Sequence, residues 1–291
     1  MKIGFIDYDL NHSHATGFLK NVRELLADKS MDVSYAWEMK QVGDDWCTAQ
    51  GVRKAASLEE VVSKSDAIMI LAPDNIDEHL QLFQKTVAAL KNPKPVYIDK
   101  YLHTRLNEAR EIVALAKARN IPIMSGSALR FSPDLEKALP EMKNVLTCTV
   151  NGYGPMWVYG IHTISMGMRI MGSGLTRVIN TGTEQEGVIT AEFGNRKMFA
   201  HIVMSENSYK IFPWSFSAFC ASEQASCGFI CVAGTATGGF FENLIRSVGS
   251  FFASGTQQVT DDEMLDTVAV LELAEASRKA GGVWLTVKQT K

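Results

Sequence analysis

The first 124 residues alternate short apolar runs with longer amphipathic segments, and this pattern limits the possible folds most. The apolar runs have the length of buried parallel strands, and they cover residues 3–6, 33–37, 67–71, 96–98 and 121–124. Segments with apolar residues at helical spacing separate them, as at Phe18, Val22 and Leu25. Strands that alternate with helices predict a doubly wound parallel sheet with helices on both faces. We therefore predict an α/β domain over residues 1–124.

The pattern changes after Met124. Runs rich in Thr, Val and aromatic residues follow one another at residues 145–150, 178–181, 188–193, 197–205, 217–221 and 228–233. Their order predicts a largely antiparallel sheet, because few helical segments separate them. A capping-box pattern at Thr260 opens a helix that Gly281 closes, and a last strand follows at 283–287. We predict a second domain, of α+β class, over residues 125–291.

Composition and charge exclude several classes of partner. The net charge is -3 and no basic block is present, so nucleic acid is not an expected partner. No apolar run approaches the roughly 20 residues that cross a membrane. The 5 cysteines show no metal-site or disulfide spacing, which favours free thiols in a reducing compartment. Because Met1–Asp7 turns acidic after a few apolar residues, it does not resemble a signal peptide. We expect a cytoplasmic protein.

Polar residues follow several predicted strands at their carboxyl ends. In an open parallel sheet, ligands bind just outside these ends. Asp99 and Lys100 follow the strand at 96–98, so Lys100 is a candidate for ligand contact. The simpler alternative is a lysine at the point where the chain leaves the core, since most lysines are exposed. Glu38 ends the second strand, where an acid commonly binds the ribose of a dinucleotide.

The turn after the first strand carries two acids and two histidines: Asp7, Asp9, His12 and His14. At this position in a doubly wound sheet, His12 and Asp9 are expected to cap the first helix or to line a nucleotide site. The same residue types could instead bind a metal ion such as Zn²⁺. However, Asp7 ends a strand while His14 begins a helix, so the pattern does not place them at one point. We therefore predict no metal site, and we expect His79 and His103 at the surface.

Four short motifs occur in an order that resembles the Gfo/Idh/MocA family of NAD(P)-dependent oxidoreductases, over nearly the whole chain. The motifs are Ile70-Leu71-Ala72-Pro73, Asp99-Lys100-Tyr101, Arg130-Phe131-Ser132-Pro133 and Gly160-Ile161-His162. The resemblance implies a Rossmann-like first domain and an α+β substrate and oligomerisation domain. It also implies hydride transfer between NAD or NADP and a small sugar- or polyol-like substrate. A homodimer or homotetramer through the antiparallel sheet is expected from the same resemblance.

The resemblance also implies roles for individual residues. His162 would be the general acid/base, and Lys100 would polarise or anchor the reacting oxygen. Cofactor contacts are expected from Ile6, Asp7, Asp9, His12, His14, Glu38, Ala72, Pro73, Asn75, Asp99 and Lys100, and substrate contacts from Lys100, Arg130, Tyr153, Tyr159 and His162. Glu38 favours NAD, because its carboxylate would repel a 2′-phosphate. For His162 the alternative is a packed histidine in a methionine-rich helix.

The sequence departs from the family pattern at three places, one of which is Tyr101, where the family has a proline that is often cis. The glycines that let the backbone approach a pyrophosphate fall on Asp7, Asp9 and approximately His12. The acids expected near His162 are replaced by Val158 and Ser165, although such an acid normally fixes the tautomer of the histidine. These departures support an alternative function, a non-catalytic ligand-binding protein with a lost or altered nucleotide site.

Overall fold

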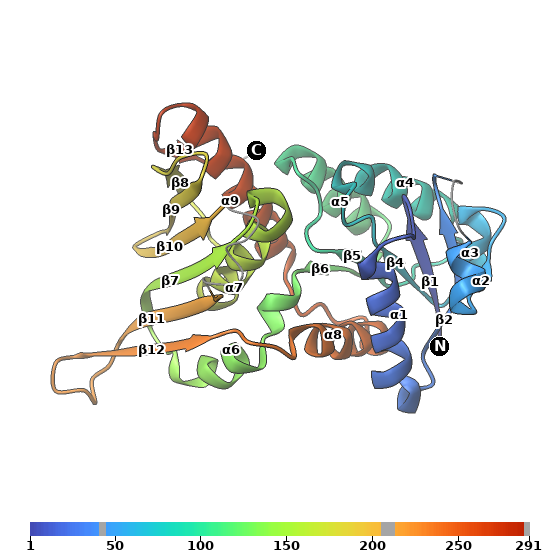
Figure 1. Cartoon of the computed structure of the whole chain (residues 1–291), viewed down its shortest axis with the longest axis horizontal. Helices are drawn as coiled ribbons and strands as arrows, with labels where there is room; N and C mark the ends of the chain where they lie inside the picture. Colours follow the sequence, from blue (N-terminus) through green and yellow to red (C-terminus); the bar gives the residue numbers. More distant parts are fainter. Residues whose placement is uncertain (41–44, 205–212, 288–291) are drawn as a thin grey trace. The chain divides into compact units, whose positions relative to one another are not determined.

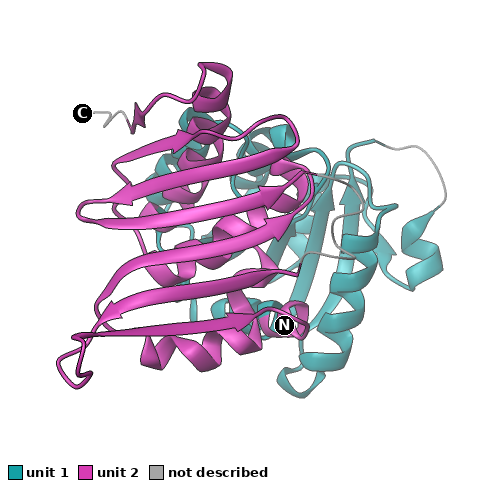
Figure 2. Cartoon of the chain, turned by 60° about the vertical axis from the view of Figure 1, so that its left-hand side comes forward, with its two compact units in different colours: residues 1–126, 244–261 teal, residues 127–243, 262–291 magenta. Residues whose placement is uncertain are grey.

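The computed structural model describes residues 1–40, 45–204 and 213–287. These residues form two compact units, which Figure 2 distinguishes by colour. The first unit contains residues 1–126 and 244–261, and the second contains residues 127–243 and 262–291. The predicted boundary after residue 124 lies next to the one between the units. Residues 244–261 belong to the first unit, whereas the sequence prediction placed them in the second domain.

The sheet of the first unit is parallel throughout, in the order β3-β2-β1-β4-β5-β6. Its strands are β1 (Lys2–Asp7), β2 (Asp32–Glu38), β3 (Arg53–Lys54), β4 (Ala67–Ile70), β5 (Val96–Asp99) and β6 (Ile123–Gly126). The strands β4 and β5 are buried at every residue, as their continuous apolar runs predict. The prediction of a doubly wound sheet is confirmed. The strand order reverses between β1 and β4, so the carboxyl ends of these two strands mark the topological switch point.

Helices cover both faces of this sheet (Figure 1). They are α1 (Ser13–Leu25), α2 (Trp46–Gln50), α3 (Leu58–Lys64), α4 (His79–Ala89) and α5 (Leu106–Ala118), with short 3-10 turns η1 (Ala27–Lys29) and η2 (Ile76–Glu78). Right-handed crossovers that run in opposite directions from β1 and from β4 place α1 and α4 on opposite faces. Gly4 permits the close approach of α3 to β1, because a Cβ atom there would collide with Val61.

The sheet of the second unit has the order β12-β11-β7-β10-β9-β8-β13. Its strands are β7 (Val145–Tyr153), β8 (Arg177–Asn180), β9 (Glu186–Phe193), β10 (Arg196–Val203), β11 (Ser215–Ala221), β12 (Phe229–Thr235) and β13 (Leu285–Thr286). The pair β7–β10 is parallel and the other pairs are antiparallel, which confirms the predicted largely antiparallel sheet.

Helices of the second unit pack on one face of its sheet (Figure 2). The unit contains η3 (Ala128–Phe131), α6 (Pro133–Ala138), η4 (Leu139–Glu141), the π-helical turn η5 (Met156–Gly160), α7 (Ile161–Met171) and, except for its first residue, α9 (Asp261–Lys279). Helix α7 packs on β7 and β10, and Gly167 allows this contact because a Cβ atom there would meet Met198. Side chains on the opposite face of the sheet include the exposed Val188, Phe199 and Phe219.

One helix was missed by the sequence prediction, which assigned no element between residue 233 and Thr260. It is α8 (Phe240–Ser254), and it begins in the second unit and continues in the first. Its buried residues Leu244, Ile245, Val248, Phe251 and Phe252 have helical spacing, so the signal was present. Gly249 lies against the side chain of Leu26, just after α1. Among the helices that the structure describes, none is long and apolar enough to cross a membrane.

Candidate functional site

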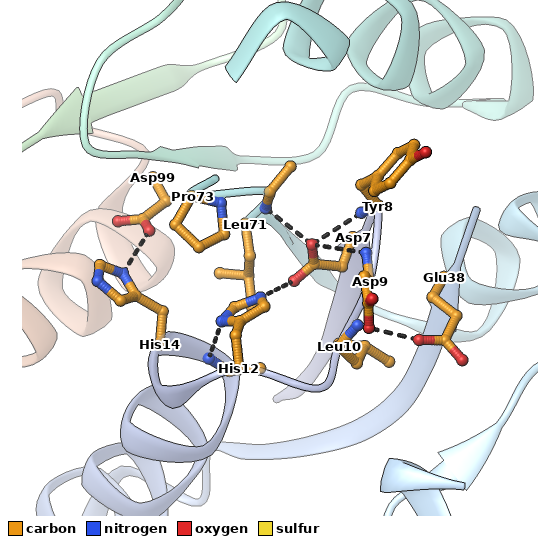
Figure 3. A network of polar contacts seen from close by, with 12 residues as sticks. Asp7, Tyr8, Asp9, Leu10, His12, His14, Glu38, Leu71, Pro73 and Asp99 are labelled. Atoms are coloured by element: carbon orange, nitrogen blue, oxygen red, sulfur yellow. Dashed lines mark hydrogen bonds and ion pairs between the residues drawn. The ribbon is translucent and has the colours of Figure 1, made fainter. Parts of the chain in front are cut away.

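Asp7 lies at the switch point of the first unit, at the end of β1 (Figure 3). Its side chain is buried, with 1% exposed. Oδ1 accepts hydrogen bonds from the backbone N–H groups of Tyr8 at 2.7 Å, Asp9 at 3.3 Å and Ala72 at 3.0 Å. Because Ala72 follows β4, this carboxylate connects the carboxyl ends of the two strands between which the sheet order reverses.

His12 forms a hydrogen bond with the second carboxylate oxygen of Asp7 and also caps α1. Nε2 lies 2.8 Å from Asp7 Oδ2, and Nδ1 accepts the N–H of Ala15 at 3.2 Å. In the neutral ring, therefore, Nε2 carries the proton and donates a hydrogen bond to the carboxylate of Asp7. Burial raises the pKa of Asp7, and the hydrogen bond and charge interaction with His12 oppose this rise. Burial alone would lower the pKa of His12, but the hydrogen bond to Asp7 and the nearby carboxylates raise it above its usual value.

The other amides of this turn are bonded within the chain as well. Leu10 N–H donates to Glu38 Oε2 at 2.9 Å, Asn11 N–H donates to Asp9 Oδ1 at 3.0 Å, and His12 N–H donates to the carbonyl of Leu10 at 2.8 Å. Asp9 also pairs with Lys40 at 3.1 Å, and the N–H of Asn11 and then Lys40 lower its pKa. Each backbone N–H from residue 8 to residue 12 thus has an acceptor inside the first unit. In this arrangement the turn does not fit a diphosphate, which needs these donors.

Asp99 ends β5 and pairs with the second histidine of the turn. Oδ2 lies 2.8 Å from His14 Nδ1, and Oδ1 accepts the N–H of Lys100 at 2.8 Å. Burial would raise the pKa of this carboxyl, but the charge and hydrogen bond of His14, followed by the charge of Lys100, lower it below its usual value. Asp99 is therefore a buried carboxylate that orients the His14 ring and the start of the Lys100 loop.

Lys100 follows Asp99 with a left-handed backbone, at φ 60, which is uncommon for a residue other than glycine. Only 4% of the residue is exposed. Among the described residues, the carbonyl oxygen of Pro73 accepts a hydrogen bond from Nζ at 3.2 Å. An ammonium group has three donors, and a buried one is costly to leave partly unsatisfied. Lys100 thus retains the capacity to donate to a ligand oxygen at the carboxyl edge of the sheet.

His79, the first residue of α4, was expected at the surface, and this prediction is wrong. Its ring is fully buried: Nε2 lies 2.9 Å from the Leu71 carbonyl, and Nδ1 lies 3.2 Å and 3.1 Å from those of Tyr101 and Leu102. The ring therefore connects the segment after β4 to the segment after β5. Burial lowers its pKa, although the surrounding carbonyls and Asp99 oppose this. His103 is also buried, contrary to prediction, with 5% exposed.

In the second unit, His162 lies at the start of α7 among aromatic rings. Its Nδ1 is hydrogen bonded to Ser127 Oγ at 2.6 Å, and Ser127 Oγ also accepts the N–H of Leu129 at 3.3 Å. The rings of Tyr159 and Trp214 contact the imidazole edge-on, with centroid distances of 5.9 Å and 6.0 Å. A neutral hydroxyl thus occupies the orienting position where an acid was expected from the resemblance. Sequence reasoning missed both Ser127 and Trp214.

The remaining predicted substrate residues also lie in the second unit. Tyr153 stacks on Trp214 at a centroid distance of 4.3 Å and lies 6.1 Å from the ring of Tyr159. Arg130 is buried and forms an ion pair with Glu263 of α9. Burial lowers the pKa of Arg130, and the charge of Glu263 opposes this shift. The ion pair accounts for the burial of the Arg130 guanidinium, and its contact with substrate stays a prediction.

The predicted cofactor residues all belong to the first unit. Figure 3 shows seven of them near the carboxyl ends of its strands: Asp7, Asp9, His12, His14, Glu38, Pro73 and Asp99. Ile6 lies inside β1, and Asn75 begins the turn η2 after β4. The two acids and two histidines of the turn do not converge on one point, because Asp9 turns to Lys40 and His14 turns to Asp99. Within the described residues, no group of three or more His, Cys, Asp or Glu side chains is arranged to hold a metal ion.

Comparison with solved structures identifies similar folds along the whole chain. A myo-inositol dehydrogenase from Lactobacillus casei in complex with NAD(H) and myo-inositol matches with a TM-score of 0.79 and 11% identity, over 100% of this chain and 97% of the other. GenD2 from gentamicin A biosynthesis, in complex with NAD, matches with a TM-score of 0.77 and 15% identity, over 99% and 97%. A myo-inositol dehydrogenase from Corynebacterium glutamicum ATCC 13032 matches with a TM-score of 0.74 and 15% identity, over 100% and 99%.

The chain has the fold of these three proteins. The fold expected from the resemblance to the Gfo/Idh/MocA family is thereby confirmed. No protein-family model matches the chain, and no curated protein matches it by sequence. At this level of identity the likeness concerns the fold, and function is argued from the residues of the site.

Proposed function

We propose that this protein is an oxidoreductase that uses a nicotinamide nucleotide and acts on a small sugar- or polyol-like substrate. The observation that carries the proposal is Lys100, a buried ammonium whose hydrogen bond among the described residues goes to the Pro73 carbonyl, so that it can also donate to a ligand oxygen. It lies at the carboxyl edge of a doubly wound sheet, where ligands of this architecture bind. The solved structures of the same fold include GenD2 in complex with NAD and a myo-inositol dehydrogenase in complex with NAD(H) and myo-inositol.

Two side chains would act on the substrate. Lys100 would donate to the reacting oxygen, held in place by its bond to Pro73 and by the neighbouring carboxylate of Asp99. His162 would exchange the hydroxyl proton, since an imidazole titrates near neutral pH. Its ring is oriented by Ser127. A nicotinamide supplies the hydride chemistry when it is bound, and the protein supplies orientation and proton transfer. The buried Glu38, at the end of β2, favours NAD over NADP.

The test is calorimetric titration with NAD⁺, NADH, NADP⁺ and NADPH up to millimolar concentration, followed by a polyol screen for nucleotide-dependent turnover. We expect Lys100→Met and His162→Asn to lower turnover by about 100-fold or more, because each removes a group that acts on the reacting oxygen or its proton. His201→Asn is a matched control, because His201 pairs with Glu186 on the strands of the second unit. The proposal fails if no nucleotide binds and no polyol is oxidised.

A second candidate function is a non-catalytic protein that binds a small polar ligand. The observation in its favour is the turn after β1, whose amides are bonded to Asp7, Asp9 and Glu38. Such a protein would be stabilised against heat by a polyol alone, without nucleotide. A thermal melt with polyol, with nucleotide and with both therefore separates the two candidates.

A further inference from the structure

The turn between β1 and α1 is already filled by an anion that belongs to the chain. In a doubly wound sheet this turn holds a pyrophosphate through backbone N–H groups and through the N-terminus of the following helix. Here the carboxylate of Asp7 accepts N–H groups from Tyr8, Asp9 and Ala72. These donors come from both sides of the switch point, and His12 binds the remaining oxygen at 2.8 Å. Figure 3 shows the carboxylate at the centre of this network.

We propose that Asp7 is the residue that sets the affinity of this turn for diphosphates, because it occupies their place as an internal anion. A diphosphate then binds only in molecules whose Asp7 carboxylate has turned away from the three amides. The proposal rests on the proposed function, which requires a nucleotide at this edge of the sheet. It adds a specificity-determining residue that acts by competition.

The strength of this competition follows from the bonds that must be broken. Hydrogen bonds from N–H groups to a carboxylate are charge-assisted and stronger than neutral ones. Asp7 is buried, so a diphosphate beside its charge would meet repulsion that water screens little. The apparent affinity falls by the fraction of molecules in which the turn is open. The bonds of Leu10 to Glu38 and of Asn11 to Asp9 do not involve Asp7, so they remain when Asp7 leaves.

The experiment measures binding of ADP-ribose, which carries the diphosphate without the nicotinamide, by calorimetry. The variants are Asp7→Gly, which empties the turn, and Asp7→Asn, which keeps the shape and removes the charge. We expect Asp7→Gly to bind ADP-ribose at least about tenfold more tightly than the wild type, because the amides no longer have to be released. Asp7→Asn should change the affinity in the same direction by less. Adenosine, which has no phosphate, should bind all of these proteins equally.

Asp66→Asn is the matched control. Asp66 Oδ2 accepts the N–H of Lys2 at 2.7 Å, so it too is a carboxylate bonded to a β1 amide, but at the opposite end of the strand. Its removal should leave ADP-ribose binding unchanged. If Asp7→Gly does not fold, as shown by its thermal melt, Asp7→Asn decides the question alone. Equal or weaker binding of ADP-ribose by the folded variant would overturn the proposal.

The two proposals can fail separately, because ADP-ribose has no hydride-transferring group. Tighter ADP-ribose binding by Asp7→Gly, without turnover of any polyol, would support the role of Asp7 and reject the oxidoreductase. Turnover by the wild type, together with an affinity of Asp7→Gly for ADP-ribose that equals that of the wild type, would support the oxidoreductase and reject the role of Asp7.

Discussion

At the scale of single residues, His12 uses both ring nitrogens, one for the helix cap and one for Asp7. Its pKa in the folded protein is raised above the usual value, chiefly by Asp7 acting against burial. Because the pKa of His12 is raised on folding, its interaction with Asp7 stabilises the folded protein fully below the unfolded-state pKa of His12, about 6.5. This stabilisation is lost as the pH rises through the pKa of His12 in the folded protein. His12→Asn retains a capping residue and removes this titration. We expect urea unfolding to show a larger loss of stability in His12→Asn at pH 5.5 than at pH 8.5. An equal loss of stability at both pH values would show that the His12–Asp7 interaction does not stabilise the folded protein in a pH-dependent way.

At the scale of elements, the segments after β4 and β5 depend on His79. Both contain a non-glycine residue with positive φ, Ala72 at 37 and Lys100 at 60, and such residues persist only where the surroundings hold them. The His79 ring contacts carbonyls of both segments. We expect His79→Leu to lower the free energy of unfolding by about 2 to 4 kcal/mol, because buried carbonyls lose their donor. His79→Gln, which can still donate to one segment, should restore part of this loss. Denaturant titration of the three proteins checks the order, and a His79→Leu variant as stable as the wild type would exclude the role.

The elements also show what the sequence could predict and what it could not. Apolar periodicity is a local property, so it predicted the parallel strands and the position of Asp99 and Lys100 at the end of one of them. Contacts between distant residues leave no such signal. Asp7 and Ala72 are 65 residues apart, and His14 and Asp99 are 85 apart. The sequence therefore indicated an unusual turn at Asp7 but not that its amides are bonded internally. The burial of His79 was missed for the same reason.

At the scale of the whole molecule, one face of the second unit's sheet exposes large apolar side chains. Phe199 aligns with Thr149 and Phe219 with Thr147, so both project from the same face, opposite the buried Cys148 and Val150. Phe199 is 39% exposed and Phe219 is 42% exposed. Clusters of exposed apolar residues mark interaction surfaces in soluble proteins. We expect a second copy of the chain to cover this face, as the resemblance implied.

Light scattering coupled to gel filtration tests this expectation. The wild type should run as a dimer or tetramer, and the double variant Phe199→Lys, Phe219→Lys should run as a smaller species, because two buried charges at the interface would lack partners. Ile230→Lys is the matched control. Ile230 is similarly exposed, at 37%, but it aligns with the buried Cys220 and so projects from the other face. Dissociation by the double variant and not by Ile230→Lys would assign the interface to this face. A monomeric wild type would contradict this expectation, because the sheet would then not join copies of this chain.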